Sequence, residues 1–311
     1  MNLESIWTST GIKLLHHPNV IKKLLKGIGS PVSLQIAPTS RCQLNCVFCS
    51  NANREKHEDL ESELIIDILN NLSHIGLKTV EWTGGGDPTL YKPIQTMIMA
   101  ARLLDLEQGF ITNGIALNTL SPVVLNMLSW VRISMNCLDY VSKIDIPEFP
   151  GVLGFSYVIN PKTTEDILLN LSEYVKQYNP RYVRIVPNCQ ASLEQQEENN
   201  RVLSETVAQW DLPYFYQAKT FSRPEKCWWG YLKPFILHDG YVYPCSSVVL
   251  NEDSEKTFHE KYRWIKAENI MSLYDKPMCS FPTENCSHCV FRGQNDMVSS
   301  LLTHTGMENF V

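Results

Sequence analysis

Residues 32–49 have the sequence VSLQIAPTSRCQLNCVFC, an apolar run followed at once by three cysteines. The run Val32 to Pro38 predicts a buried strand, and Cys42, Cys46 and Cys49 then share one short loop. Three thiolates so close together favour a metal site, because soft thiolates bind zinc, copper(I) or iron-sulfur clusters and three cannot all pair as disulfides. A four-ligand site needs a distant fourth ligand, whereas three protein ligands leave one metal position open.

Strand and helix signals alternate after this stretch. The predicted strands span residues 32–38, 78–83, 108–112, 130–135, 153–159 and 182–186, and the predicted helices span residues 60–75, 92–104, 122–128, 163–178 and about 192–210. Six strands alternating with helices predict an α/β protein with a parallel sheet, curved or closed as a barrel. Residues 138–151 hold two prolines and no helical period, so we expect a loop there, either over the barrel mouth or simply on the surface.

Both ends of the chain differ from this pattern. Residues 11–28 have apolar side chains at helical spacing and predict a helix pair packed on the main domain rather than a membrane-surface helix. From Leu212 the chain changes to short aromatic-rich runs with five of the ten cysteines. We therefore expect an N-terminal helical extension (1–31), a core domain (32–211) and a smaller, cysteine-rich C-terminal domain (212–311).

The composition of the chain indicates its cellular compartment and limits the classes of partner that it could bind. A hydrophobic content of 44% suffices for a sizeable core. Ten cysteines without a signal peptide, a long apolar span or a lipidation motif indicate a reducing cytoplasm and metal-bound thiolates. The net charge of -6 argues against a nucleic-acid polymer, since basic side chains drive such binding. We predict a cytoplasmic protein with no membrane partner.

The cysteine loop, with Phe48 just before its third cysteine, resembles the cluster loop of the radical S-adenosylmethionine (SAM) superfamily. In that family three cysteines hold a 4Fe-4S cluster whose fourth iron binds SAM, and an electron from the cluster cleaves SAM to methionine and a 5'-deoxyadenosyl radical. The resemblance implies a partial six-stranded, TIM-like barrel and an electron donor such as flavodoxin or ferredoxin. A zinc loop with a distant fourth ligand is the alternative.

A glycine turn and the strand ends extend the resemblance. The turn GGGDP, Gly84 to Pro88, stands where the family has a GGEP-like turn that binds the amino group of SAM, with Gly86 and Asp87 in place of Gly-Glu. Ser134, Asn136 and Arg184 are candidates for the ribose and carboxylate of SAM, and the backbone near Val186 for its adenine. The candidate SAM contacts are thus Phe48, Gly84, Gly85, Gly86, Asp87, Asn113, Ser134, Asn136, Arg184 and Val186. For each one, capping of a strand or turn is the alternative.

Four later cysteines form a second set: Cys227, Cys245, Cys286 and Cys289. Four thiolates complete a tetrahedral site, and a zinc ribbon is one explanation. The order of a cysteine, Gly-x4-Cys and CxxC also resembles the twitch domain, a shortened SPASM domain that binds one auxiliary 4Fe-4S cluster. That resemblance leaves Cys279 without a metal.

Two cysteines remain, Cys137 and Cys189, each just after a predicted strand. They are either small buried apolar side chains or a hydrogen-atom donor facing the barrel mouth. The donor role follows from the resemblance, because some family members use such a cysteine.

The resemblance implies an enzyme that abstracts a hydrogen atom from a small polar or carrier-linked substrate, with the auxiliary cluster accepting an electron in an oxidation or dehydrogenation. One alternative is a redox-neutral epimerase or isomerase with a cysteine hydrogen donor, and another is a peptide-modifying maturase. A third is a zinc-stabilised binding module without SAM chemistry.

Overall fold

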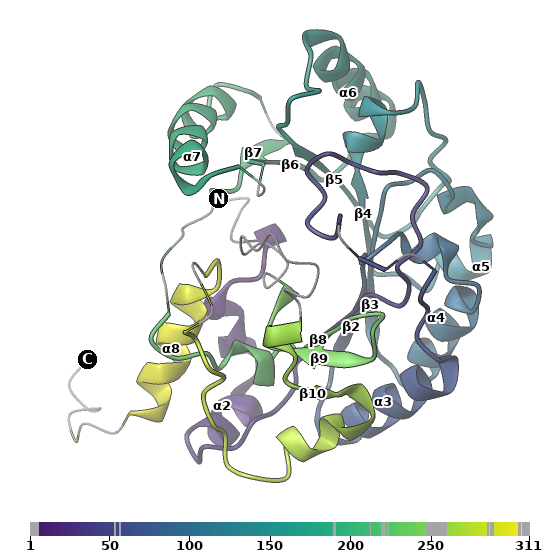
Figure 1. Ribbon diagram of the computed structural model, residues 1–311. Coiled ribbons are helices and arrows are strands. Elements are labelled where there is room, and N and C mark those ends of the chain that lie inside the picture. Colours follow the sequence, from purple (N-terminus) through teal and green to yellow (C-terminus); the bar gives the residue numbers. More distant parts are fainter. Residues whose placement is uncertain are drawn as a thin grey trace.

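Figure 1 shows the computed structural model of the chain, a curved sheet with helices along its convex side. The structure describes residues 6–306 except 53, 56, 189, 190, 212, 219–221, 223, 247–259, 285, 287, 288, 304 and 305. Within these residues, no helix has both the length and the apolar character needed to cross a membrane.

The sheet has ten strands in the described part of the chain. From one edge to the other they are β10 (Ile265–Lys266), β9 (Tyr241–Tyr243), β8 (Phe235–Ile236), β1 (Ser33–Ile36), β2 (Thr79–Trp82), β3 (Glu107–Thr112), β4 (Trp130–Ser134), β5 (Val152–Val158), β6 (Tyr182–Val186) and β7 (Tyr214–Tyr216). All neighbours from β8 to β7 pair in parallel, and β9 and β10 add antiparallel pairs. The six predicted strands form β1 to β6, which confirms the α/β, partial TIM-like barrel.

Helices follow most of the parallel strands. They are α3 (Ser62–Ile75), α4 (Ile94–Leu103), α5 (Pro122–Leu125), α6 (Glu165–Tyr178) and α7 (Leu193–Val207). The apolar stripe of α3 is buried at Ile65, Ile68, Leu69 and Leu72, and the helix ends at Gly76, whose φ of 124° suits glycine. Helix α5 is shorter than predicted. After β4 comes the short 3₁₀ helix η4 (Met135–Asp139) and then no α-helix before β5, as expected from the two prolines.

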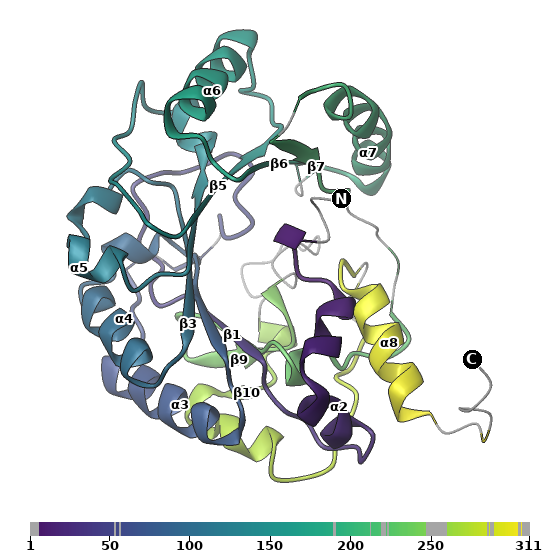
Figure 2. The same ribbon diagram turned by 180° about the vertical axis from the view of Figure 1, so that it is seen from behind.

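The two ends of the chain meet on the concave side of the sheet (Figures 1 and 2). The 3₁₀ helix η1 (Gly11–His16) and helix α2 (Pro18–Leu24) lie beside α8 (Arg292–Leu302). Lys233 Nζ and Gln294 Nε2 donate to the hydroxyl and the carbonyl of Ser9, both at 2.9 Å. The N-terminal helices therefore pack on the main body.

Residues after 212 extend the core sheet at both edges, because β7 pairs with β6 and β8 pairs with β1. β8 and β9 form a hairpin around His238-Asp239-Gly240, and Gly240 adopts a positive φ of 79° in its turn. The division into a core domain and a C-terminal domain stays a prediction.

Candidate active site

The cysteine loop follows β1 at the carboxyl end of the sheet. It turns where the amide of Cys49 donates to the carbonyl of Cys46 at 3.0 Å. Burial raises the pKa of the Cys46 thiol to about 12, and electrostatic repulsion from Cys49 and Cys42 contributes to the rise. Burial also raises the pKa of Cys42. The three sulfur atoms therefore lie within electrostatic reach of one another.

Polar N–H groups point at two of these sulfur atoms. The amide of Leu44 and the Nδ2 of Asn113 approach Cys42 Sγ at 3.5 and 3.7 Å. Arg54 Nη1 lies 3.6 Å from Cys49 Sγ. Such donors stabilise thiolate charge and tune iron-sulfur clusters. Asn113, a predicted SAM contact, is thus in direct contact with the cysteine loop.

Arg54 was not predicted as a site residue. Its side chain is buried, and it donates to the carbonyl of Ser40 at 2.7 Å and to that of Asn51 at 2.6 Å. These bonds fix the guanidinium under the loop. A basic residue five positions after the third cysteine was the available signal.

The glycine turn packs on the start of the cysteine loop. The amide of Gly86 donates to the carbonyl of Thr39 at 2.8 Å, and the amide of Asp87 donates to that of Arg41 at 2.6 Å. A Cβ on Gly86 would overlap the carbonyl of Arg41, so only glycine permits this approach. The turn and the loop therefore form one unit.

The Asp87 carboxylate joins the ends of β2 and β3. Its side chain accepts bonds from the amide and hydroxyl of Thr89 (3.0 and 2.6 Å), the hydroxyl of Thr112 (2.9 Å) and the amide of Asn113 (2.7 Å). Burial raises the pKa of this carboxyl and the bonds oppose the rise. Protein donors therefore satisfy both carboxylate oxygens.

Asp139 joins the ends of β4 and β5. It accepts from Asn136 Nδ2 (3.0 Å), Tyr157 OH (2.7 Å) and Asn160 Nδ2 (2.9 Å). Asn136 also accepts from the amide of Val158 at 2.7 Å, so this predicted SAM contact is tied into the strand ends. Asp139 was missed; an acidic residue five positions after the end of β4 was its signal.

The loop at residues 138–151 reaches the cysteine loop through Tyr140. Its hydroxyl accepts from the amide of Val47 at 3.0 Å, and Lys162 Nζ lies 4.1 Å from its ring centroid. The first part of this loop therefore lies at the carboxyl end of the sheet, where the mouth was expected.

A cavity of about 880 Å³ lies inside the curve of the sheet. Side chains from β1 to β6 line it, together with the N-terminal residues 6–10. Of the predicted site residues only Arg184 lines it, from the middle of β6, whereas Ser134 and Val186 end their strands. Phe48 stays in the cysteine loop, half-buried.

Two glycines make room on the inner face of the sheet. A Cβ on Gly109 would overlap the ring of Trp130, and one on Gly154 would overlap the ring of Tyr182. The rings of Trp130 and Tyr182 therefore pack over glycines of the neighbouring strands.

One ion pair lies in the cavity wall. Lys233 Nζ is 2.6 Å from a carboxylate oxygen of Glu81, whose other oxygen accepts from Gln35 Nε2 at 2.7 Å. Burial alone would raise the pKa of Glu81, but Lys233 outweighs it and holds the pKa below its usual value. None of the three residues was predicted.

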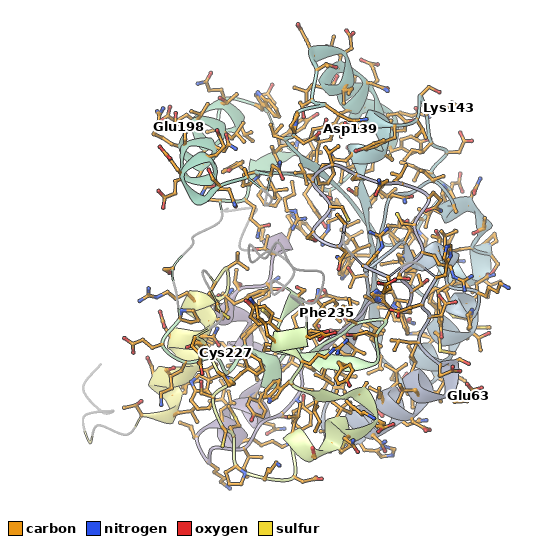
Figure 3. All side chains as sticks on the ribbon, in the orientation of Figure 1. Glu63, Asp139, Lys143, Glu198, Cys227 and Phe235 are labelled. Atoms are coloured by element: carbon orange, nitrogen blue, oxygen red, sulfur yellow. The ribbon has the colours of Figure 1, made fainter. Side chains whose placement is uncertain are left out.

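The C-terminal cysteines lie around a second hydrophobic cluster. Cys227 belongs to it, and Cys245 and Cys286 pack against it. Figure 3 shows its members Cys227 and Phe235. Burial raises the pKa of Cys227 well above its usual value. Electrostatic repulsion from the other three thiols adds to this rise, in the order Cys245, Cys289 and Cys286. The four predicted thiols are thus brought together, while Cys279 is exposed.

Cys289 receives N–H groups as Cys42 does. The amide of Phe291 and the Nδ2 of Asn295 approach its sulfur at 3.3 and 3.8 Å. Asn295 Oδ1 accepts from the amides of Trp228 and Trp229, at 2.7 and 2.9 Å. Asn295 therefore connects the first and last cysteines of the set.

Of the two candidate hydrogen donors, Cys137 is 1% exposed and belongs to the main hydrophobic core. Burial raises its pKa to about 12. Cys189 lies outside the described residues.

Residues 36–139 match the family model "Radical SAM superfamily". The match runs from the end of β1 through the cysteine loop and the glycine turn to Asp139. This segment of the chain is therefore similar to the radical SAM superfamily.

Two proteins are similar in sequence to parts of this chain. A probable GTP 3',8-cyclase of Pyrococcus abyssi is 34% identical over 37% of this chain. A PqqA peptide cyclase of Rhodopseudomonas palustris is 23% identical over 70% of this chain. The matches span 39% and 67% of those two proteins, respectively.

A likeness in fold to a solved structure extends over most of the chain. Streptococcus suis SuiB, solved bound to the precursor peptide SuiA, matches with a TM-score of 0.55 and 16% identity, over 93% of this chain and 76% of that one. At this identity the likeness shows the fold alone.

Both cysteine sets of this protein fit iron-sulfur ligation by their donor chemistry. Each gathers thiols that raise one another's pKa, and each presents N–H groups to a sulfur atom. Across the described residues, however, no group of three or more His, Cys, Asp or Glu side chains has the tight spacing of bound metal ligands.

Proposed function

We propose that this radical SAM enzyme cleaves SAM reductively at Cys42, Cys46 and Cys49 and oxidises a small polar or carrier-linked substrate, with an auxiliary 4Fe-4S cluster at Cys227, Cys245, Cys286 and Cys289. When bound, the first cluster would supply the electron that cleaves SAM to the hydrogen-abstracting 5'-deoxyadenosyl radical. The auxiliary cluster would accept the electron left on the substrate. An electron donor such as flavodoxin or ferredoxin would reduce the enzyme.

The adjacency of the two cysteine sets carries this proposal. Ala37, directly after β1 and five residues before Cys42, lies in the same hydrophobic cluster as Cys227. Leu237, after β8, belongs to that cluster too and would lie 3.2 Å from a Cβ on Gly85. The shared cluster supports electron transfer between the sites.

The protein groups at the carboxyl end of the sheet would position SAM. Asp87 and Asp139 hold two pairs of strand ends in fixed geometry, which leaves the glycine backbone and the strand ends as a preformed surface. The aromatic ring of Phe48 and the Ser134 hydroxyl are the proposed side-chain contacts on that surface.

The size of the cavity favours a small substrate. A volume of about 880 Å³ lies within the range of roughly 300–1,000 Å³ usual for small-molecule sites. A peptide substrate is the second candidate, favoured by the names of two similar proteins, the PqqA peptide cyclase and the peptide-bound SuiB. A single peptide side chain would also fit the cavity.

Iron and sulfide content of protein purified without oxygen tests the proposal. We expect about eight irons per chain in the wild type and about four in the variant with Cys42, Cys46 and Cys49 all changed to alanine. Zinc in both sets would replace the proposal with a zinc-stabilised binding module. Zinc in the second set alone would leave a one-cluster enzyme.

A further inference from the structure

Two arginines in the cavity have no acidic partner among the described residues. Arg132 of β4 and Arg184 of β6 both line it, and the Nε atom of each is buried without a hydrogen-bond partner. Arg184 Nη1 donates to Gln217 Oε1 at 3.0 Å. The Arg132 guanidinium lies over the ring of Trp130, 5.7 Å from its centroid.

The neighbouring charges leave these two guanidiniums uncompensated. Glu81, the carboxylate whose field reaches Arg132, is already bonded to Lys233 and Gln35. Lys13 also lines the cavity and donates to backbone carbonyls. Burial lowers the pKa of Arg184 to about 9, and repulsion from the positive charge of Arg132 contributes to this shift. The cavity wall therefore carries an excess of positive charge.

A guanidinium with a buried and unpaired N–H is costly, and proteins retain such groups where a ligand completes them. A guanidinium offers a planar fork of N–H donors that matches a carboxylate or a phosphate in two parallel bonds. Arg132 and Arg184 stand on either side of β5 and repel each other, and an anion between them would relieve this repulsion.

We propose that Arg132 and Arg184 bind an anionic group of the substrate, a carboxylate or a phosphate, inside the barrel. Calling the ligand the substrate rests on the proposed function, whereas the anion site itself does not. This role for Arg184 replaces the SAM contact expected from the sequence, because the cavity it lines is also lined by residues that begin strands, such as Thr79 and Val152.

The floor of the cavity sets the direction of the ligand. Trp7 stacks on Tyr182 with ring centroids 5.1 Å apart, at the amino end of β6. Residues 6–10 line the cavity on this side, opposite the cysteine loop. An anion held by the arginines therefore lies deep in the barrel, and the rest of the ligand extends toward the carboxyl end of the sheet.

Calorimetric titration of the full chain with inorganic phosphate, and separately with succinate, tests the site. We expect saturable binding of at least one probe, about 10- to 100-fold weaker in Arg132→Gln, as the loss of a charged hydrogen-bonding group predicts. Arg132→Lys, which keeps the charge, should bind more tightly than Arg132→Gln. Arg102→Gln, an exposed arginine at the end of α4, is the matched control and should bind as the wild type does.

The probes distinguish the two anions, since saturable binding of phosphate alone indicates a phosphate site and of succinate alone a carboxylate site. Absence of binding by both probes at millimolar concentration, or equal affinity of wild type and Arg132→Gln, would overturn the proposal.

Thermal unfolding without anion gives a second readout. Arg132→Met should unfold at a higher temperature than the wild type, because it removes an uncompensated charge, and a lower temperature would indicate a structural role instead.

SAM cleavage by the same wild-type preparation separates this proposal from the proposed function. Cleavage without anion binding rejects the anion site and retains the function. Anion binding without cleavage retains the site and rejects the radical SAM reaction.

Discussion

The buried carboxylates at the carboxyl end of the sheet and the two arginines in the cavity differ in how fully the protein satisfies their hydrogen-bonding groups. At the carboxyl end, Asp87 and Asp139 each accept bonds from three neighbouring residues, so the protein completes its own network. In the cavity, Arg132 and Arg184 keep nitrogen atoms without partners.

The difference distinguishes a surface that must stay fixed from one that must accept a ligand. A satisfied network is rigid and holds the cysteine loop against the strand ends before anything binds. Unsatisfied donors lower the free energy of unfolding of the protein, and a ligand that accepts their hydrogen bonds raises it again. The first region thus suits a cofactor common to a family, and the second suits the part of the reaction specific to this chain.

The largest effect should come from removing the ligands at the carboxyl end. Changing Cys42, Cys46 and Cys49 together to alanine should abolish formation of 5'-deoxyadenosine from SAM under dithionite, measured by chromatography, because no other described group can replace the three thiolates on that loop. Cys279→Ala, which removes an exposed cysteine, should cleave SAM as the wild type does. Retained cleavage in the triple variant would mean that this loop is not where SAM reacts.

Breaking the ion pair between Glu81 and Lys233 in the cavity should cost the most stability. Glu81→Gln leaves Lys233 buried without its partner, and we expect a loss of about 3–5 kcal/mol in the free energy of unfolding by denaturant titration. Glu63→Gln on the outer surface of α3 (Figure 3) should change it by less than about 0.5 kcal/mol. A loss below that of the control would show that the pair is not coupled to folding.

The same pair predicts a pH dependence. The pKa of Glu81 lies below its usual 4.5 in the folded chain, so its stabilising effect is complete above about pH 4.5 and is lost as the pH falls through the lower folded value. Glu81→Gln should remove this part of the acid sensitivity, as seen in unfolding free energies measured from pH 6 downward. An identical pH profile for both proteins would contradict it.

Disturbing the satisfied network should have a smaller effect. Asp87→Asn turns an acceptor into a donor that faces the Thr112 hydroxyl and the Asn113 amide, and we expect a loss of about 1–3 kcal/mol. Asp67→Asn, on the exposed face of α3, is the control. If both variants unfold alike, the Asp87 bonds do not contribute to the stability of the strand ends.

The smallest effect is expected at Cys137. Its burial in the core predicts that Cys137→Ala loses about 1 kcal/mol of stability through a small cavity, without loss of product. Product analysis beside SAM cleavage is the check. A variant that still forms 5'-deoxyadenosine but makes no product would instead establish the hydrogen-donor role.

The sequence predicted the strands of the barrel because their burial is regular. β1 to β6 alternate with helices whose apolar stripes and caps are local signals, such as Thr164 before α6 and Ser192 before α7, each of which caps its helix. The strands β7 to β10 have only two or three residues each, too few for a period to appear. Their place in the core sheet is set by pairing alone.

The cavity was beyond sequence reasoning for a related reason. Arg132 alternates with the buried Val131 and Ile133, as any half-exposed strand residue would. Nothing local indicates that its face turns inward. The partner of Glu81 is Lys233, 152 positions away, and no pattern connects them. Site residues carried by a motif, the cysteines and the glycine turn, were found; those carried by tertiary contact, such as Arg54 and Asp139, were not.

The bonds of Ser9 to Lys233 and Gln294 have a consequence for folding. They join residues 224 and 285 positions apart, so the floor of the cavity forms only after nearly the whole chain has been synthesised. Contacts of such long sequence separation form slowly, and the partly folded barrel stays open on that side in the meantime. Shortening the interval between the two ends, for example by joining residue 6 to residue 303 in a circular permutant, should speed the last step of folding.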